Sequence, residues 1–179
     1  KQAGDQAQGA TAYVTLEPCA HYGRTPPCAN GLVEAGITRV VIACSDPNPL
    51  VAGKGVQILK NAGIEVLQGV CEAQAAAQNR GFLKAIATGM PYVRLKVASS
   101  LDGRTAMASG ESKWITGTAA RQDVQHWRAI SGVVITGIET VLADDCQLNV
   151  RQLNGIEDIT RIVQPKRLVL DRQGRLPLN

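Results

Sequence analysis

Two cysteines, a histidine and an arginine lie within one short segment rich in proline and glycine. Cys19 and Cys28 are nine positions apart, and His21 and Arg24 lie between them. Cysteine thiolates are good zinc ligands, and a catalytic zinc site takes three protein ligands and leaves one position for water. The spacing leaves two interpretations open, because unpaired cysteines are also common in protein cores. The pair supplies part of a zinc site, or it only fills space.

The residues around this segment predict a layered α/β unit. Apolar and β-branched runs predict strands, and Gly-terminated amphipathic runs predict helices. The predicted strands are 10–16, 39–44 and 64–67, and the predicted helices are 29–35 and 56–62. Strands that alternate with helices favour a sheet with crossover connections. Pro18 suits the first turn of a helix, so both Cys19 and Cys28 are expected at helix starts.

Polar residues follow the second predicted strand, in the Pro-rich segment 45–49. In α/β sheets, functional side chains gather beyond the carboxyl ends of the strands, where both Cys19 and this segment are expected. Asp46 and Asn48 therefore either share a pocket with Cys19 or only form side-chain turns onto their own backbone.

The second half of the chain has a different pattern. One long amphipathic helix is predicted over 71–88, and we place a domain boundary near Gly89, before Pro91. Further strands are predicted at 92–98, 132–137, 148–150 and 167–171, and helices at 118–130 and 139–144. A strand, a glycine and a helix start are the ingredients of a phosphate site. Without a G-x-G-x-x-G motif, a Rossmann domain is not supported.

Composition narrows the class of protein. The chain has 179 residues, 45% of them apolar, and a net charge of +4 that is not gathered into one run. This argues against nucleic acid as a partner and fits a small anionic substrate. Five cysteines without regular spacing, no signal peptide and no membrane-spanning stretch indicate a cytoplasmic protein. The first and last residues suggest an internal piece of a longer protein, and we expect a homo-oligomer.

The segment Glu17–Cys28 resembles the zinc motif of the bifunctional riboflavin-biosynthesis deaminase-reductases, members of the cytidine-deaminase superfamily. The resemblance implies that Cys19 and Cys28 bind Zn²⁺, that Asp46 and Asn48 contact the pyrimidine or ribose, and that His21 and Arg24 contact the phosphate. Zinc deaminases carry an H-x-E motif whose Glu shuttles the proton. None precedes Cys19, so no catalytic residue is assigned within the chain, and we expect a His ligand and this Glu upstream of Lys1.

Three later segments, 96–103, 110–116 and 140–145, resemble the reductase half of the same family, whose fold is similar to that of dihydrofolate reductase. The residues that the resemblance assigns to NADPH are Ala98, Trp114, Thr140 and Asp144. Those that it assigns to the phosphorylated ribose are Lys96, Ser112, Arg128, Leu148 and Arg151. From the residues alone, Trp114 is equally well a core side chain and Arg128 a surface charge. Cys146 and Arg172 depart from the family pattern.

We therefore expect an α/β chain with a cytidine-deaminase-like three-layer domain at 1–89 and a dihydrofolate-reductase-like domain at 90–179, each lacking part of its sequence. The resemblance implies zinc-dependent deamination of diaminohydroxyphosphoribosylaminopyrimidine, followed by NADPH-dependent reduction of the ribosyl side chain. Two alternatives remain: a tRNA base deaminase, and a non-catalytic binding module stabilised by zinc. The long cysteine spacing and the second domain disfavour the first, whereas the missing Glu permits the second.

Overall fold

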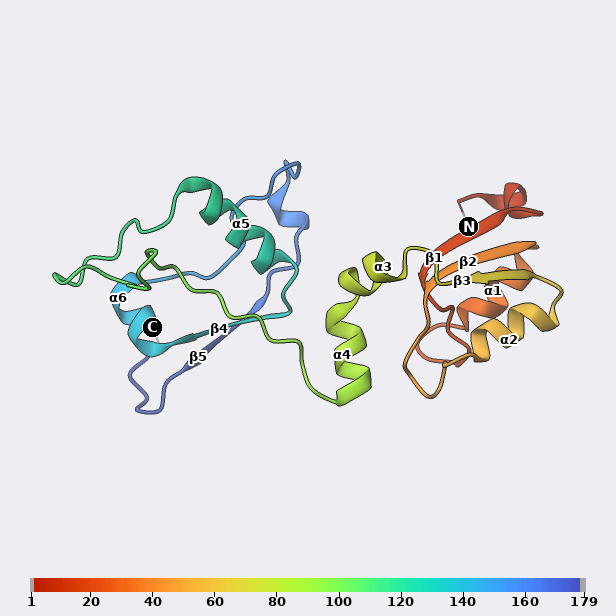
Figure 1. Ribbon diagram of the computed structural model, residues 1–179, viewed down its shortest axis with the longest axis horizontal. Helices are drawn as coiled ribbons and strands as arrows, with labels where there is room; N and C mark the ends of the chain where they lie inside the picture. The colour runs from red at the N-terminus through yellow and green to blue at the C-terminus, as the bar shows by residue number, and fades with distance from the viewer. Residues whose placement is uncertain (1, 178–179) are drawn as a thin grey trace. The chain divides into compact units, whose positions relative to one another are not determined.

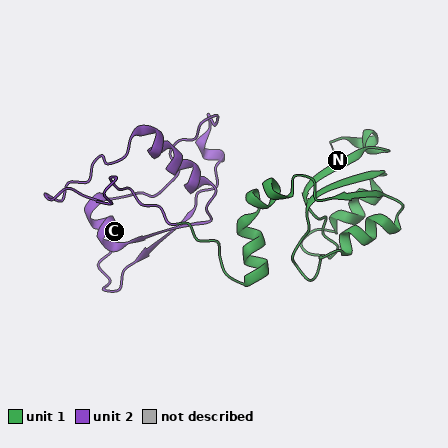
Figure 2. Ribbon diagram, in the orientation of Figure 1, with its two compact units in different colours: residues 1–94 green, residues 95–179 purple. Residues whose placement is uncertain are grey.

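The computed structural model describes residues 2–177 and divides into two compact units, Lys1–Arg94 and Leu95–Asn179 (Figure 2). Both units mix helices with parallel strands, as Figure 1 shows, and this confirms the predicted α/β class. Within the described residues, no helix is both long enough and apolar enough to cross a membrane.

Unit 1 is built on a parallel three-stranded sheet. Its elements in chain order are η1 (Gly4–Ala7), β1 (Thr11–Leu16), α1 (Cys28–Glu34), β2 (Arg39–Cys44), α2 (Lys54–Asn61), β3 (Glu65–Gln68), α3 (Glu72–Gln78) and α4 (Arg80–Thr88). The strand order is β1-β2-β3, with Tyr13 opposite Val41 and Val41 opposite Leu67. The central strand β2 is therefore the most buried, which explains why its sequence is an almost unbroken apolar run.

The core of unit 1 lies between the sheet and the helices α1 and α2 (Figure 1). Val40 and Ile42 of β2 project into it and meet Leu59 of α2, and all three side chains are fully buried. On β2, Cys44 is also buried, and its Sγ donates to the carbonyl oxygen of Glu72 at 3.3 Å. This packing fixes the carboxyl ends of β1 and β2 side by side, with Leu16 opposite Cys44.

The long helix predicted over 71–88 is instead two helices, α3 and α4. They meet at Asn79, whose backbone leaves the helical region and whose side-chain amide donates to the carbonyl oxygen of Ala75 at 3.0 Å. Asparagine competes with helical hydrogen bonding in this way, which the apolar pattern alone does not reveal.

Unit 2 contains α5 (Thr118–Ala129), β4 (Val133–Gly137), α6 (Ile138–Asp144), η2 (Ile159–Arg161) and β5 (Lys166–Leu170). Strands β4 and β5 pair in parallel, with Ile135 opposite Leu168. The strand predicted at 92–98 is wrong: residues 89–117 contain neither helix nor strand, and Val93 and Leu95 are exposed. Alternation describes a strand only where a neighbouring strand accepts its hydrogen bonds, and none does so here within the described residues.

Candidate functional site

The two cysteines of the Pro-rich segment converge in space. Cys28 is the first residue of α1, and its backbone N–H donates to the Sγ of Cys19 at 3.1 Å. The next amide, that of Ala29, donates to the carbonyl oxygen of Cys19 at 3.2 Å. A hydrogen bond with the Cys19 thiol, together with burial and the charge of that thiol, raises the pKa of Cys28. The turn between the cysteines therefore closes and places both sulfur atoms at the start of α1.

The expectation that Pro18 begins a helix is wrong. Residues 17–27 contain no helix, and Cys19 lies in the turn after β1. Its sulfur nevertheless accepts the first amide of α1, because residues 20–27 loop back on themselves before Pro27 caps the helix. Cys19 thus reaches a helix start from outside the helix.

The donor set at this turn fits part of a zinc site. Two thiols that converge are two of the ligands that a catalytic zinc ion needs. Within residues 2–177, however, no third His, Cys, Asp or Glu joins them in a group that could hold a metal ion. Cys19 and Cys28 are therefore suited to hold zinc only together with a further ligand.

The residues between the cysteines differ in environment. His21 is half-buried, and its Nδ1 is buried with no hydrogen-bond partner in the described part of the chain. An orphaned buried nitrogen costs free energy unless a ligand or water satisfies it. Arg24 is exposed. The pair thus offers one unsatisfied buried nitrogen and one exposed cation.

Asp46 and Asn48 form the local turns that the sequence left open as an alternative. Asp46 is buried, and its Oδ1 accepts the backbone N–H of Asn48 at 2.8 Å. Asn48 repeats the pattern, because its Oδ1 accepts the N–H of Leu50 at 3.0 Å. These turns lie directly after β2, next to the end of β1 that leads to Cys19. The turns at Asp46 and Asn48 are therefore close to the Cys19 turn. The side chains of Asp46 and Asn48 each accept a local backbone hydrogen bond that holds these turns.

Sequence patterns assigned no role to Glu17, yet its carboxylate is a centre of hydrogen bonding. It is only 3% exposed and accepts backbone N–H groups from Asp46, Gly53 and Val56, at 3.4, 3.1 and 3.3 Å. The one sequence signal is an acidic residue at the end of an apolar strand, immediately before a proline.

Unit 2 brings two of its predicted arginines together. The guanidinium of Arg128, on α5, is half-buried and donates to the carbonyl oxygen of Asn149 at 3.0 Å. Its pKa is lowered, first by burial and second by the nearby charge of Arg151. Like charges held close together indicate a site that favours an anion.

The segment that carries Arg151 is held by two glutamines that the sequence did not single out. Gln125 is buried and accepts the backbone N–H of Arg151 at 3.0 Å. Gln164 bonds both sides of Val150, accepting its N–H at 2.8 Å and donating to its carbonyl oxygen at 3.1 Å. The strand predicted at 148–150 is wrong, because these amide bonds replace a strand partner and Leu148 has a positive φ of 53°.

The remaining predicted residues of unit 2 lie on separate elements. Thr140 and Asp144 are on α6, where the Thr140 carbonyl oxygen accepts the Cys146 thiol at 3.8 Å. Trp114 is 72% exposed, so it is not a core residue, and the guanidinium carbon of Arg121 lies 4.5 Å from its ring centroid. The others, Lys96, Ala98 and Ser112, lie in the irregular segment 89–117, and within the described residues no hydrogen bond joins them to Arg128 or Arg151.

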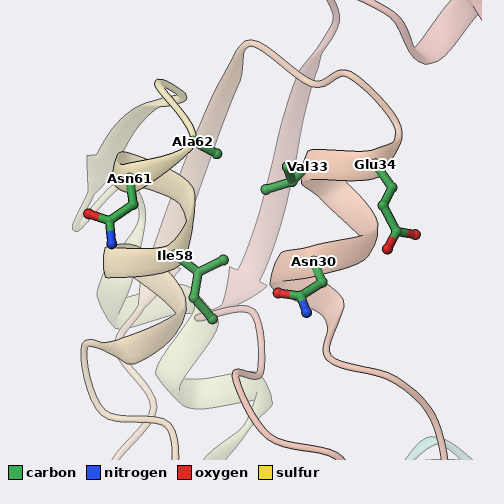
Figure 3. Close-up of a pocket in the computed structure, with 6 residues that line it drawn as sticks. All are labelled: Asn30, Val33, Glu34, Ile58, Asn61 and Ala62. Carbon is green, nitrogen blue, oxygen red and sulfur yellow. The ribbon is translucent and has the colours of Figure 1, made fainter.

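A cavity of about 420 Å³ opens between α1 and α2 (Figure 3). None of its lining residues is among the predicted site residues: they are Asn30, Val33, Glu34, Ile58, Asn61 and Ala62.

Comparison with known proteins matches the two parts of the chain to two different families, in the order that the sequence predicted. Residues 1–44 match the cytidine and deoxycytidylate deaminase zinc-binding region, and residues 91–179 match the RibD C-terminal domain. The two matches define the class of protein, in which a deaminase zinc-binding region precedes a RibD C-terminal domain in one chain. The two predicted fold families are thereby confirmed. Residues 91–179 therefore form a RibD C-terminal domain, and the chain is similar to RibD proteins over nearly its whole length.

Relatives and solved structures agree with this assignment. The riboflavin biosynthesis protein RibD of Haemophilus influenzae is 57% identical over 98% of this chain, and that of Escherichia coli is 52% identical over 98%. A structure of Acinetobacter baumannii RibD has 80% identity and a TM-score of 0.91 over 99% of the chain. The deaminase/reductase of Thermotoga maritima has 40% identity and a TM-score of 0.81 over 96%. The chain spans about half the length of each: 49%, 50%, 50% and 47%.

Proposed function

We propose that this chain forms part of a bifunctional enzyme of riboflavin biosynthesis. The first reaction is hydrolytic deamination of diaminohydroxyphosphoribosylaminopyrimidine, which replaces an amino group with oxygen from water and releases ammonia. The second is reduction of 5-amino-6-(5-phosphoribosylamino)uracil to the ribitylamino product with NADPH. The observation that carries the proposal is the convergence of Cys19 and Cys28, with the Cys28 amide 3.1 Å from the Cys19 sulfur. The family matches in both halves support it.

In the deaminase half, assigned to residues 1–89, Cys19 and Cys28 hold zinc together with a third ligand. Zinc, when bound, acts as a Lewis acid and lowers the pKa of a water molecule. The chain's own side chains bind and orient the substrate. Asp46 and Asn48 face the pyrimidine or ribose, and His21 and Arg24 face the phosphate. The unsatisfied Nδ1 of His21 supports this role, because a ligand would supply the missing hydrogen bond.

In the reductase half, assigned to residues 90–179, Arg128 and Arg151 bind the ribose phosphate. A phosphate between the two guanidiniums relieves their mutual repulsion, and arginine binds phosphate oxygens in pairs. Lys96, Ser112 and Leu148 complete this subsite. NADPH supplies the hydride when bound, and Ala98, Trp114, Thr140 and Asp144 contact it. The exposed indole of Trp114 supports a contact of this kind.

We further propose that the enzyme acts as a homo-oligomer in the cytoplasm. All five cysteines are free thiols, which suits a reducing compartment. Size-exclusion chromatography with light scattering tests the oligomer, and a monomeric mass would reject it.

Turnover by the protein that carries this sequence tests the proposal. Purified protein is assayed for zinc content, for ammonia release from the phosphorylated aminopyrimidine, and for NADPH oxidation with the deaminated product. We expect all three to be positive. Replacing Arg151 by alanine should raise the KM for the sugar phosphate far more than that for NADPH, whereas equal effects would reject its phosphate role. Deamination of tRNA in place of the pyrimidine, or zinc without turnover, would favour the two alternatives.

A further inference from the structure

Glu17 is a buried carboxylate that no cation neutralises within the described residues. Its exposed fraction is 3%, and its three hydrogen-bond donors are all backbone amides. A buried charge is tolerated only when fixed dipoles replace its lost hydration. Keeping Glu17 at this position therefore constrains the segments that supply those amides.

The donors come from two segments that follow β2. Asp46, which supplies the first amide, is the first residue of the turn that ends at Asn48. The amides of Gly53 and Val56 lie at the start of α2. Gly53 is the N-cap of α2 and has no side chain to cap the helix. Glu17 bonds the amide of Val56 three residues further on, which is the bond that an N-cap side chain usually makes. A residue that follows β1 thus caps a helix that follows β2.

The same residue leads directly into the Cys19 turn. The backbone N–H of Glu17 extends the pairing of β1 with β2 by donating to the carbonyl oxygen of Cys44 at 2.9 Å. After it, the carbonyl oxygen of Pro18 lies against α2 so closely that a Cβ on Gly55 would be 1.9 Å away. One carboxylate therefore ties together three segments: the turn that holds Cys19, the turn that holds Asp46, and the start of α2.

We propose that Glu17 is a positioning residue for the deaminase reaction. It holds the Cys19 turn and the Asp46–Asn48 turn at a fixed separation. This rests on the proposed function, in which the substrate reaches from the metal to Asp46 and Asn48. Without the carboxylate, each turn moves independently, and a substrate that touches both binds more weakly. The three amides that Glu17 binds all lie in the deaminase half, so the reductase half should keep its activity.

The test replaces Glu17 by glutamine in the protein that carries this sequence. Glutamine has nearly the same shape, but only one of its two head-group atoms accepts hydrogen bonds, and its NH₂ group opposes an amide donor. Glu34→Gln is the matched control, because Glu34 is exposed on α1. Amide hydrogen exchange by NMR reports the link directly, and deaminase and reductase kinetics report its effect. The reductase serves as an internal control in the same polypeptide.

In Glu17→Gln we expect the amides of Asp46, Gly53 and Val56 to exchange about tenfold faster or more, as loss of one charge-assisted bond implies. The deamination KM should rise about tenfold, with a smaller change in kcat, and the reductase should stay within about twofold of its normal rate. Glu17→Asp, which is one methylene shorter, should reach only some of the donors and give intermediate values. The Glu34→Gln control should change neither set of measurements.

Three results would overturn the proposal: unchanged exchange at the three amides, faster exchange with an unchanged deamination KM, or equal losses in both activities. If Glu17→Gln does not fold, Glu17→Asp decides by the same criteria. Absence of deamination in the unmodified protein would instead reject the proposed function. Amide exchange would then still decide whether Glu17 ties the two turns, so the two failures are distinguishable.

Discussion

Replacing Gly55 by alanine should destabilise α2, although alanine is the better helix former. A Cβ at Gly55 would lie 1.9 Å from the carbonyl oxygen of Pro18 and 3.3 Å from Oε1 of Glu17, and side chains essentially never approach within 3.0 Å. The Pro18 turn and α2 must therefore separate by about 1.1 Å or more. Overpacking of this kind costs about 1–3 kcal/mol, and strained hydrogen bonds to Glu17 add about 1 kcal/mol or more.

Alanine returns only about 1 kcal/mol through helix propensity. The net loss should be about 2 kcal/mol, which corresponds to about thirtyfold faster amide exchange in residues 54–61 if they open locally. Hydrogen exchange with peptide-level mass spectrometry suits the measurement, because both tryptophans lie in unit 2 and their fluorescence reports on the other unit.

The matched control is Gly31→Ala in α1. Gly31 has the same helical setting, but a Cβ added there would meet no atom within 4 Å beyond its own helix backbone. We expect this control to slow exchange in α1 by up to about fivefold, from a gain of up to about 1 kcal/mol. If the amides of residues 54–61 exchange in Gly55→Ala at the normal rate or more slowly, the close approach of α2 to the Pro18 turn is wrong. The proposed role of Glu17 would then rest on its hydrogen bonds alone.

Three further predictions concern the rest of unit 1. Leu59→Ala should destabilise the unit by about 3 kcal/mol, because Leu59 is fully buried in the core. Chemical denaturation followed by amide exchange measures this, and a loss of unfolding free energy below about 1 kcal/mol would contradict the packing. The Cys44 thiol should be alkylated far more slowly than the exposed Cys71 thiol near neutral pH, because burial raises the pKa of Cys44 and leaves less thiolate. Mass spectrometry measures both alkylation rates, and equal rates would refute this. Arg80→Gln should raise the pKa of Tyr92, because a hydrogen bond from Arg80 and the charge of Arg80 lower that pKa at present. Ultraviolet titration of the phenol should then show ionisation at higher pH. An unchanged titration curve would argue against the contact between Arg80 and Tyr92.

Local patterns predicted unit 1 well because its central strand is buried. Strand β2 occupies Arg39–Cys44, the range expected from an uninterrupted apolar run. A central parallel strand is the environment that makes such a run necessary. The helix stops at Gly36 and Gly63 were also informative, since both have a positive φ, of 69° and 78°. At these positions, residue type and backbone conformation are tightly coupled.

Unit 2 was predicted less well because its order depends on contacts between distant residues. The alternation at 92–98 resembles that of β4, but among residues 2–177 only β4 of the two has a strand partner, β5, about thirty residues later. The segment around Arg151 is fixed by the side chains of Gln125 and Gln164. Such bonds replace a strand partner without leaving any periodic pattern in the sequence.

The candidate site shows the same division between local and distant information. The density of reactive side chains from Cys19 to Cys28 singled out the turn, and the prolines and glycine between them indicated a loop. This pattern could not show that Glu17 binds amides 29, 36 and 39 positions away. Those bonds depend on β1 and β2 ending side by side, so that one carboxylate reaches both the Asp46 turn and α2. Glu17 looks in the sequence like the polar end of a strand. We infer that it is the residue through which the fold of unit 1 sets the separation of the Cys19 and Asp46 turns.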